Sequence, residues 1–143
     1  MKNYPLMLII CALLTGCDSG SDPAFNAEQL LGFWSRETVY LNGVNSNAYV
    51  DFLNGGTNFL DIKRDKTFSR AYDNGSWALF DEALVLDRME SNGRGDWKYK
   101  IIHRSAGDLV LEIKLTGGQY CCGFDAFAED EVITIREVYK RLN

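Results

Sequence analysis

From residue 33 onward the chain is a series of short segments that alternate apolar and polar residues, separated by turn sequences at regular intervals. The clearest segment spans residues 97–104. Cations occupy most of one of its faces, and the other face carries Trp97, Tyr99, Ile101 and His103. A period of two is that of a strand with one buried face, whereas amphipathic helices repeat every 3.6 residues. The sequence therefore predicts an all-β domain.

Eight segments fit the strand pattern, and residues 48–53 are a weaker ninth candidate. The eight are residues 33–41, 59–64, 67–72, 76–80, 83–86, 97–104, 109–115 and 132–141. Turns are predicted at residues 65–66, 73–75 and 81–82, and a long loop at residues 116–130. Residues 26–32 have a capping residue, a Gln three positions later and a terminal Gly, which predict a short N-terminal helix.

No crossover helix separates these strands, so the chain is expected to run up and down in one antiparallel sheet. Closing such a sheet removes the two edges that would otherwise stay unpaired. We therefore expect an antiparallel up-and-down eight-stranded barrel, with a two-sheet β-sandwich as the alternative.

The N-terminus has the pattern of an export signal. A short positive start precedes an apolar run at residues 6–14, which is well below the roughly 20 residues that span a bilayer. The run ends in Leu14-Thr15-Gly16-Cys17, which resembles the bacterial lipobox. The resemblance implies cleavage before Cys17 and fatty acylation of its sulfur; the alternative is a plain secretory signal that leaves Cys17 free.

These features divide the chain into three parts: a signal peptide at residues 1–16, a lipidated cysteine with a flexible tether at residues 17–25, and one domain at residues 26–143. Two or three acyl chains anchor a protein stably without a transmembrane helix. We expect a lipoprotein of the bacterial cell envelope, anchored to a membrane and facing the periplasm. The choice between the inner and the outer membrane stays open.

The charge balance bears on partners. Lys and Arg number 15 against 20 Asp and Glu, a net charge of −5, so the basic surface that binds nucleic acid is missing. We expect no nucleic-acid partner.

Several short motifs, in their order and spacing, resemble the lipocalin-like domains of small bacterial lipoproteins. They are Leu31-Gly32-Phe33-Trp34, Asp65-Lys66-Thr67-Phe68, Gly75-Ser76-Trp77-Ala78-Leu79, Leu84-Val85-Leu86, Tyr99-Lys100-Ile101 and Tyr139-Lys140-Arg141-Leu142. The G-x-W motif of that family falls on Gly32 and Trp34. The resemblance implies that Trp34 plugs one end of the barrel beneath a cation from the last strand, either Arg136 or Arg141.

The inward face of residues 97–104 supplies the candidate ligand pocket, namely Trp97, Tyr99, Ile101 and His103. His103 either points into the barrel or sits near solvent at a strand end. Tyr120 and Phe124, in the long loop, either line the open mouth of the barrel or fold down as a lid on an ordinary core.

Adjacent Cys121 and Cys122 fit neither a metal site nor a relaxed disulfide. Neighbouring Cα atoms lie about 3.8 Å apart, below the usual disulfide range, and zinc ligands need wider spacing. A strained redox pair, free thiols and a bond to another chain stay open. We expect no metal and no cofactor.

An enzyme is the least favoured function, because the chain has a single histidine and none of the common catalytic motifs. Two other functions stay open. The resemblance favours a barrel that binds a small apolar ligand; the alternative is a barrel filled by its own side chains, whose outer surface binds an envelope protein as an inhibitor or interaction module.

Overall fold

The computed structural model describes residues 26–53, 58–71, 73–88, 96–120 and 127–142. Nine strands occur in this part of the chain: β1 (Gly32–Leu41), β2 (Val44–Asn45), β3 (Phe59–Ile62), β4 (Thr67–Arg70), β5 (Asp73–Phe80), β6 (Ala83–Arg88), β7 (Trp97–Arg104), β8 (Asp108–Thr116) and β9 (Val132–Arg141). They form one antiparallel sheet in the order β2-β1-β3-β4-β5-β6-β7-β8-β9.

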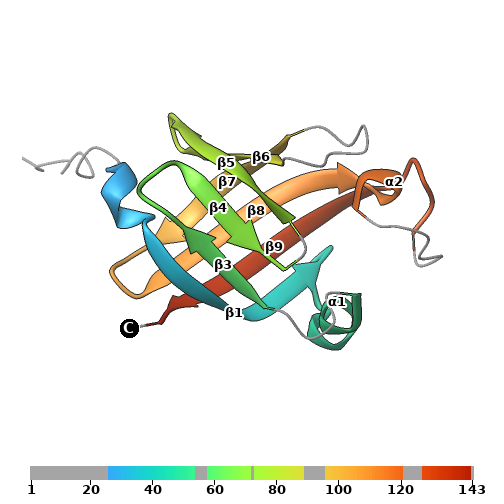
Figure 1. Cartoon of the computed structure of the whole chain (residues 1–143). Coiled ribbons are helices and arrows are strands. Elements are labelled where there is room, and N and C mark those ends of the chain that lie inside the picture. Colours follow the sequence, from blue (N-terminus) through green and yellow to red (C-terminus); the bar gives the residue numbers. More distant parts are fainter. Residues whose placement is uncertain (1–25, 54–57, 72, 89–95, 121–126, 143) are drawn as a thin grey trace, which may run out of the picture.

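β1 also pairs with β9, so eight strands close into a barrel and β2 extends β1 as a hairpin (Figure 1). The predicted all-β, eight-stranded antiparallel barrel is confirmed, and the alternative of two separate sheets is wrong. The physical reason is the β1–β9 pairing, which gives the first and last barrel strands a partner on both sides.

The seam between β1 and β9 contains a β-bulge. The pairing runs from Trp34↔Arg141 to Leu41↔Ile135, with a register shift between Arg36 and Thr38. One extra residue reverses which face the following side chains occupy. As a result Trp34 and Arg36 are buried before the bulge, and Val39 and Leu41 after it.

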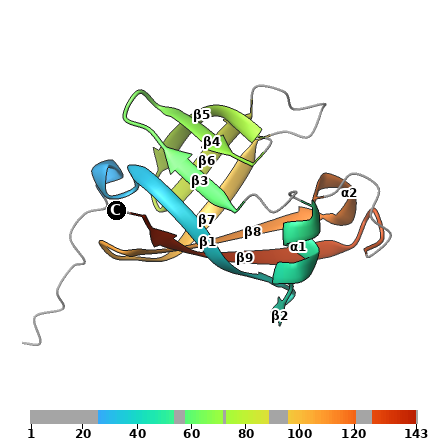
Figure 2. The ribbon, with the colours of Figure 1, turned by 60° about the horizontal axis from the view of Figure 1, so that its bottom comes forward.

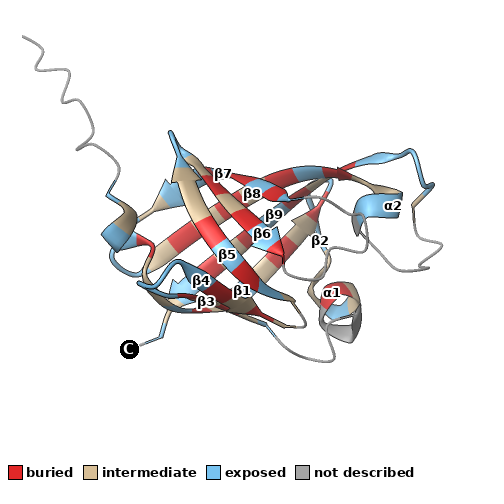
Figure 3. Ribbon diagram, turned by 45° about the horizontal axis from the view of Figure 1, so that its top comes forward, coloured by how far each residue is buried: buried red, intermediate tan, exposed pale blue. Residues whose placement is uncertain are grey.

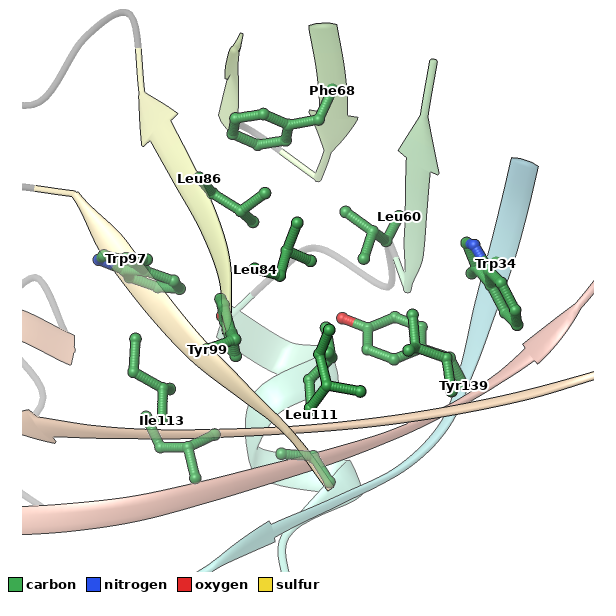
Figure 4. Close-up of a cluster of buried hydrophobic side chains, with 14 of the residues drawn as sticks. Trp34, Leu60, Phe68, Leu84, Leu86, Trp97, Tyr99, Leu111, Ile113 and Tyr139 are labelled. Atoms are coloured by element: carbon green, nitrogen blue, oxygen red, sulfur yellow. The ribbon is translucent and has the colours of Figure 1, made fainter. Parts of the chain in front are cut away.

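Buried and non-buried residues alternate along the other long strands, which appears as red bands across the ribbon (Figure 3). β8 buries Leu109, Leu111, Ile113 and Leu115, and β9 buries Ile133, Ile135, Glu137 and Tyr139. The apolar members join one core with Leu60, Phe68, Leu84 and Leu86 from β3, β4 and β6 (Figure 4).

One end of the barrel is closed by Trp34. The ring is fully buried, and its Nε1 donates to the carbonyl oxygen of Leu30 at 2.8 Å. Leu30 ends the short 3-10 helix η1 (Ala27–Gln29), which covers this end of the barrel together with the C-terminal residues (Figure 2). The guanidinium carbon of Arg141 lies 4.2 Å from the Trp34 ring centroid.

Arg141 also joins the covering segments through hydrogen bonds. It donates to the carbonyls of Gln29 at 2.7 Å, of Ala106 at 2.8 Å and of Leu31. Gly32 leaves room for it, because a Cβ at this position would lie 2.6 Å from Arg141 Nη1 and the backbone φ is +131°. Between the two cations that the sequence offered for this role, the structure places Arg141 over Trp34.

The prediction that Arg136 could cover Trp34 is therefore wrong. Its side chain is half exposed on the outer wall, where it pairs with Glu112 at 2.6 Å. The alternation along β9 explains the difference, because Arg136 follows the buried Ile135 and points outward.

The opposite end, called the distal end below, is where β4 and β6 end, at Arg70 and Arg88, and where β7 begins, at Trp97. Two short helices, α1 (Asn47–Leu53) and α2 (Gly117–Tyr120), also lie at this end (Figure 2).

The ninth strand predicted at residues 48–53 is wrong, because this segment is α1. Its first turn is fixed by side chains that bond to the backbone: Asn47 N donates to Asn45 Oδ1, and Val39 N to Asn47 Oδ1. Val50 is then buried against the barrel. Such local bonds compete with strand pairing and favour a helix start.

The turn predicted at residues 73–75 is also wrong, because these residues belong to β5 and Asp73 pairs with Arg70. Gly75 serves close packing here, since a Cβ would lie 2.0 Å from the Asp87 carbonyl oxygen of β6. The predicted N-terminal helix is only the 3-10 turn of η1, and Gly32 starts β1 rather than ending that helix.

Replacing Arg141 with Ala should lower the free energy of unfolding by about 2 kcal/mol, because it removes charge-assisted hydrogen bonds to the closed end. Urea denaturation followed by circular dichroism would measure it. Arg136→Ala on the same strand is the matched control and should cost no more than about 1 kcal/mol, since its ion pair faces solvent. Equal losses for the two variants would contradict the role of Arg141.

Candidate functional site

The barrel interior contains charge. Among the described residues the buried charged side chains are Arg36, Arg70, Arg88 and Glu137. They come from β1, β4, β6 and β9, so only the closed barrel brings them to one interior. A charge taken out of water costs several kcal/mol unless a partner compensates it, so each of these four residues needs compensating contacts.

Glu137 links two of the arginines. Arg70 Nη2 donates to Glu137 Oε1 at 2.6 Å, and Arg36 Nη1 lies 3.8 Å from the same oxygen. The other carboxylate oxygen accepts a hydrogen bond from the Tyr139 hydroxyl at 3.2 Å. Since Glu137 is only 1% exposed, these contacts replace the water that an ionised carboxylate would otherwise bind.

Arg70 also donates to the hydroxyl oxygen of Tyr99. Burial raises the pKa of Tyr99 and of Tyr139 well above the ordinary tyrosine value, although the Arg70 charge opposes this rise. Burial alone would lower the pKa of Arg70, but the Glu137 carboxylate together with Tyr139 and Tyr99 outweighs the burial, and the pKa of Arg70 is raised. At neutral pH both tyrosines are therefore neutral and Arg70 is charged.

Trp97 connects this network to Arg88. The guanidinium carbons of Arg88 and Arg70 lie 4.6 and 5.3 Å from the Trp97 ring centroid, both within cation–π range. Arg88 Nη1 also lies 3.8 Å from Asp73 Oδ1, an ion pair longer than a hydrogen bond. The Tyr99 ring meets the Trp97 ring edge-on at 6.1 Å. We call Arg70, Trp97 and Arg88 the Arg–Trp–Arg stack.

The indole N–H of Trp97 is a buried donor for which the described residues provide no acceptor. Trp97 as a whole is 8% exposed. Figure 4 shows Trp97 at one edge of the core, with its nitrogen turned away from Tyr99 and Leu84. Buried donors in folded proteins nearly always have a partner, and leaving one unpaired costs about 1–3 kcal/mol.

The Arg–Trp–Arg stack lies at the distal end of the barrel. Arg70 and Arg88 are the last residues of β4 and β6, and Trp97 is the first residue of β7. The closed end is already occupied by Trp34 and Arg141. The charged interior groups of Arg70 and Arg88 therefore lie at the end opposite to Trp34.

Of the predicted pocket residues, the structure brings Trp97, Tyr99 and Ile101 to the interior. His103 is exposed, which matches the alternative of a strand end near solvent and not the one of an inward side chain. The reason is a bulge in β7 between Ile101 and His103, after which His103 pairs with Val110 on the outer face.

Tyr120 belongs to α2, but its side chain lies outside the described part of the structure, as do Phe124, Cys121 and Cys122. Cys17 and the rest of residues 1–25 lie outside it as well. The expectations for these residues stay predictions.

Sequence reasoning missed Arg70, Arg88 and Glu137. Each shares the inward face of its strand with an apolar residue two positions earlier, namely Phe68, Leu86 and Ile135. A charged residue at an inward position of a period-two strand is therefore a signal in the sequence that would have found them.

The described residues contain neither a metal-binding cluster nor a membrane-spanning helix. No group of three or more His, Cys, Asp and Glu side chains is placed to hold a metal ion. Among the helices in this part of the chain, none has the length and apolar character to cross a bilayer.

A hollow of about 240 Å³ lies on the outer wall, between the β1–β2 hairpin and strands β8 and β9. It is lined by Tyr40, Gly43, Glu112, Thr134 and Arg136. The Glu112–Arg136 ion pair occupies its wall, so the charged groups there already satisfy each other.

Comparison with known proteins gives a fold likeness only. No protein-family model matches the chain, and no curated protein matches it significantly. Two solved structures of bovine odorant binding protein, one with its natural ligand and one with a selenium-containing odorant, are similar, each with a TM-score of 0.45 and 16% sequence identity. The match covers 85% of this chain and 77% and 76% of those chains. This likeness assigns neither a ligand nor a site residue to the chain.

Replacing Glu137 with Gln should destabilise the fold by about 3–5 kcal/mol, because two buried guanidiniums lose their counter-charge. Urea denaturation gives the value. Glu112→Gln, which breaks the Arg136 pair on the outer wall, is the control and should cost about 1 kcal/mol or less. A combined Glu137→Leu and Arg70→Met variant should recover part of the loss. A loss in Glu137→Gln no larger than in the control would contradict the buried network.

Proposed function

We propose that the protein is a lipid-anchored protein of the bacterial cell envelope and that it binds a small, largely apolar molecule inside its barrel. The ligand enters the barrel from the distal end. The observation that carries the binding function is the unpaired indole N–H of Trp97, buried beside Arg70 and Arg88 at that end. A buried donor that the described protein leaves unpaired is a place where an incoming acceptor gains a hydrogen bond without displacing one.

The barrel geometry supports this proposal. An eight-stranded barrel is wide enough either to be filled by side chains or to hold one small ligand. With Trp34 and Arg141 across one end, entry is at the other. The apolar body of a ligand would pack beside Leu86, which pairs with Trp97 across the β6–β7 ladder, and beside Ile113 (Figure 4).

The anchoring part of the proposal rests on the lipobox-like sequence that ends at Cys17. Residues 17–25 span at most about 30 Å when extended, and they join the fold at Asn26, the cap of η1 at the closed end. An anchor at Cys17 would thus attach to the closed end, which leaves the distal end accessible from the periplasm.

We propose binding rather than catalysis because the chain's one histidine, His103, is exposed on the outer wall. The buried ionisable groups Glu137, Arg70 and Tyr99 contact one another, which suits a rigid wall better than a proton-transfer site.

The binding function predicts that the neutral apolar dye N-phenyl-1-naphthylamine binds with one site per chain, measured by its fluorescence. Ile113→Trp adds bulk beside Trp97 and should lower the affinity at least about tenfold. Val132→Trp, at an exposed position of the same end, should leave binding unchanged. If circular dichroism shows that Ile113→Trp does not fold, Leu86→Phe takes its place, because it adds less bulk to the same wall. Absence of dye binding, or equal binding by folded wall variants and control, would overturn the proposal.

The anchoring function predicts that protein purified from bacterial membranes begins at Cys17 and carries fatty acyl chains, visible by intact-mass spectrometry. Cys17→Ser should abolish the acylation, because the sulfur that accepts the lipid is gone. Cys11→Ser, within the apolar run of the signal, is the matched control and should still be processed. An unacylated Cys17 in the wild-type protein would refute the anchor without touching the binding function.

A further inference from the structure

We infer that the closed end of the barrel docks on the lipid surface that carries the acyl anchor, through an apolar patch on the outer wall formed by Phe33, Phe59 and Leu142. This inference rests on the proposed lipid anchor. It goes beyond the binding function, because it assigns one face of the barrel to the membrane.

The three side chains of the apolar patch lie next to one another on neighbouring strands. Phe33 of β1 stacks on Phe59 of β3, with ring centroids 5.2 Å apart. Leu142 follows β9, and its backbone N donates to the Phe33 carbonyl oxygen at 2.9 Å. Since Trp34 and Arg141 close the end of the barrel, the residues next to them on each strand face outward. Phe33 is 41% and Leu142 52% exposed.

The place where the tether joins the fold decides what the patch faces. The described chain starts at Asn26, which caps η1 at the closed end, and residues 17–25 extend at most about 30 Å. A bilayer that holds the acyl chains of Cys17 therefore stays within that distance of Asn26. A tether of this length raises the effective concentration of a second contact to roughly the millimolar range, so a small apolar surface at this end suffices for docking.

The size of the patch favours lipid over a second copy of the chain. From their exposed fractions, the three side chains present on the order of 200 Å² to solvent. A stable protein interface buries about 800 Å² on each partner, which is far more than the patch supplies. Insertion into the headgroup region needs no complementary protein surface, and the apolar area it buries adds to the acyl anchor.

The ionisable groups beside the patch do not oppose contact with an anionic membrane. Three acids on this side of the closed end are each paired with a cation, so they add no net charge there, although the chain as a whole carries −5. The pairs are Asp61 with Lys63, Glu28 with Arg64, and Asp108 with Lys140.

The opposite side of the closed end is acidic. Asp81 and Glu82 form the turn between β5 and β6, and β6 is four strands away from β1, halfway around the eight-stranded barrel. Phe80, which is 62% exposed, lies beside these acids. A barrel that lies on the apolar patch turns this acidic side away from anionic lipid, which repels negative charge.

The test measures how close each end of the acylated protein lies to lipid. Cys121 and Cys122 are replaced with serine, and a nitrobenzoxadiazole label is attached to one introduced cysteine. The closed-end label is at Gly107→Cys, where a Cβ meets nothing within 4 Å; the distal label is at Val132→Cys. The protein is incorporated into vesicles of phosphatidylethanolamine and phosphatidylglycerol at about 3:1, with doxyl-labelled lipid as the quencher.

We expect quenching at residue 107 to exceed that at residue 132 about threefold or more, because a docked end lies in the headgroup region. Phe33→Ser combined with Leu142→Ser should lower quenching at residue 107 by about half or more, since it removes most of the apolar area. Phe80→Ser, at an exposed phenylalanine on the acidic side of the same end, is the matched control and should change nothing. If the double variant does not fold, Leu142→Ser alone, beyond the last strand, replaces it.

Three results would contradict the inference in different ways. Equal quenching at residues 107 and 132, or equal effects of the patch and Phe80 variants, would overturn the docking and leave the anchor intact. A closed-end label shielded from both doxyl lipid and aqueous iodide, with a cross-linked dimer, would assign the patch to a second copy of the chain. Protein that carries no acyl chains and does not associate with the vesicles would overturn the proposed anchor, and the docking with it.

Discussion

Closure of the sheet between β1 and β9 is the constraint on which the rest of the structure depends. The pairing from Trp34↔Arg141 to Leu41↔Ile135 gives β1 and β9, neighbours in space but distant in sequence, a partner on each side. It sets Arg141 over Trp34 at one end and Arg36 beside Glu137 in the interior. An open sheet would leave those groups in water, and neither the plug nor the buried ion network would form.

The bulge in that seam shows how little the pattern of one strand says by itself. Arg36 and Val39 are an odd number of residues apart, yet both are buried, because the register shift between Arg36 and Thr38 reverses the faces. A similar shift in β7 turns His103 outward after Ile101. In each case one extra residue in a strand changes which of the following side chains face the barrel interior.

The interior that results is divided along the barrel axis. The closed end and the middle are filled by Trp34, Tyr139 and the core leucines, whereas the distal end combines aromatic rings with guanidiniums at the Arg–Trp–Arg stack. The aromatic rings and Glu137 stabilise these buried cations. Removing the charges from water still costs free energy that an all-apolar core would not lose.

The sequence by itself determined the class of fold and most strand positions, because alternation of period two is a local property that each segment carries. Residues 97–104 and 132–141 are strands with the predicted bounds, and Trp34 could be singled out from its motif. The hairpin turn at Asn42-Gly43 that leads to β2, where both residues have positive φ, was not predicted, although Asn-Gly is a common sequence for such a turn.

Only the tertiary structure decided that Arg70, Arg88 and Trp97 meet and that His103 faces outward. These outcomes depend on pairing between strands far apart in the chain and on a single-residue bulge, and neither leaves a signal in local periodicity.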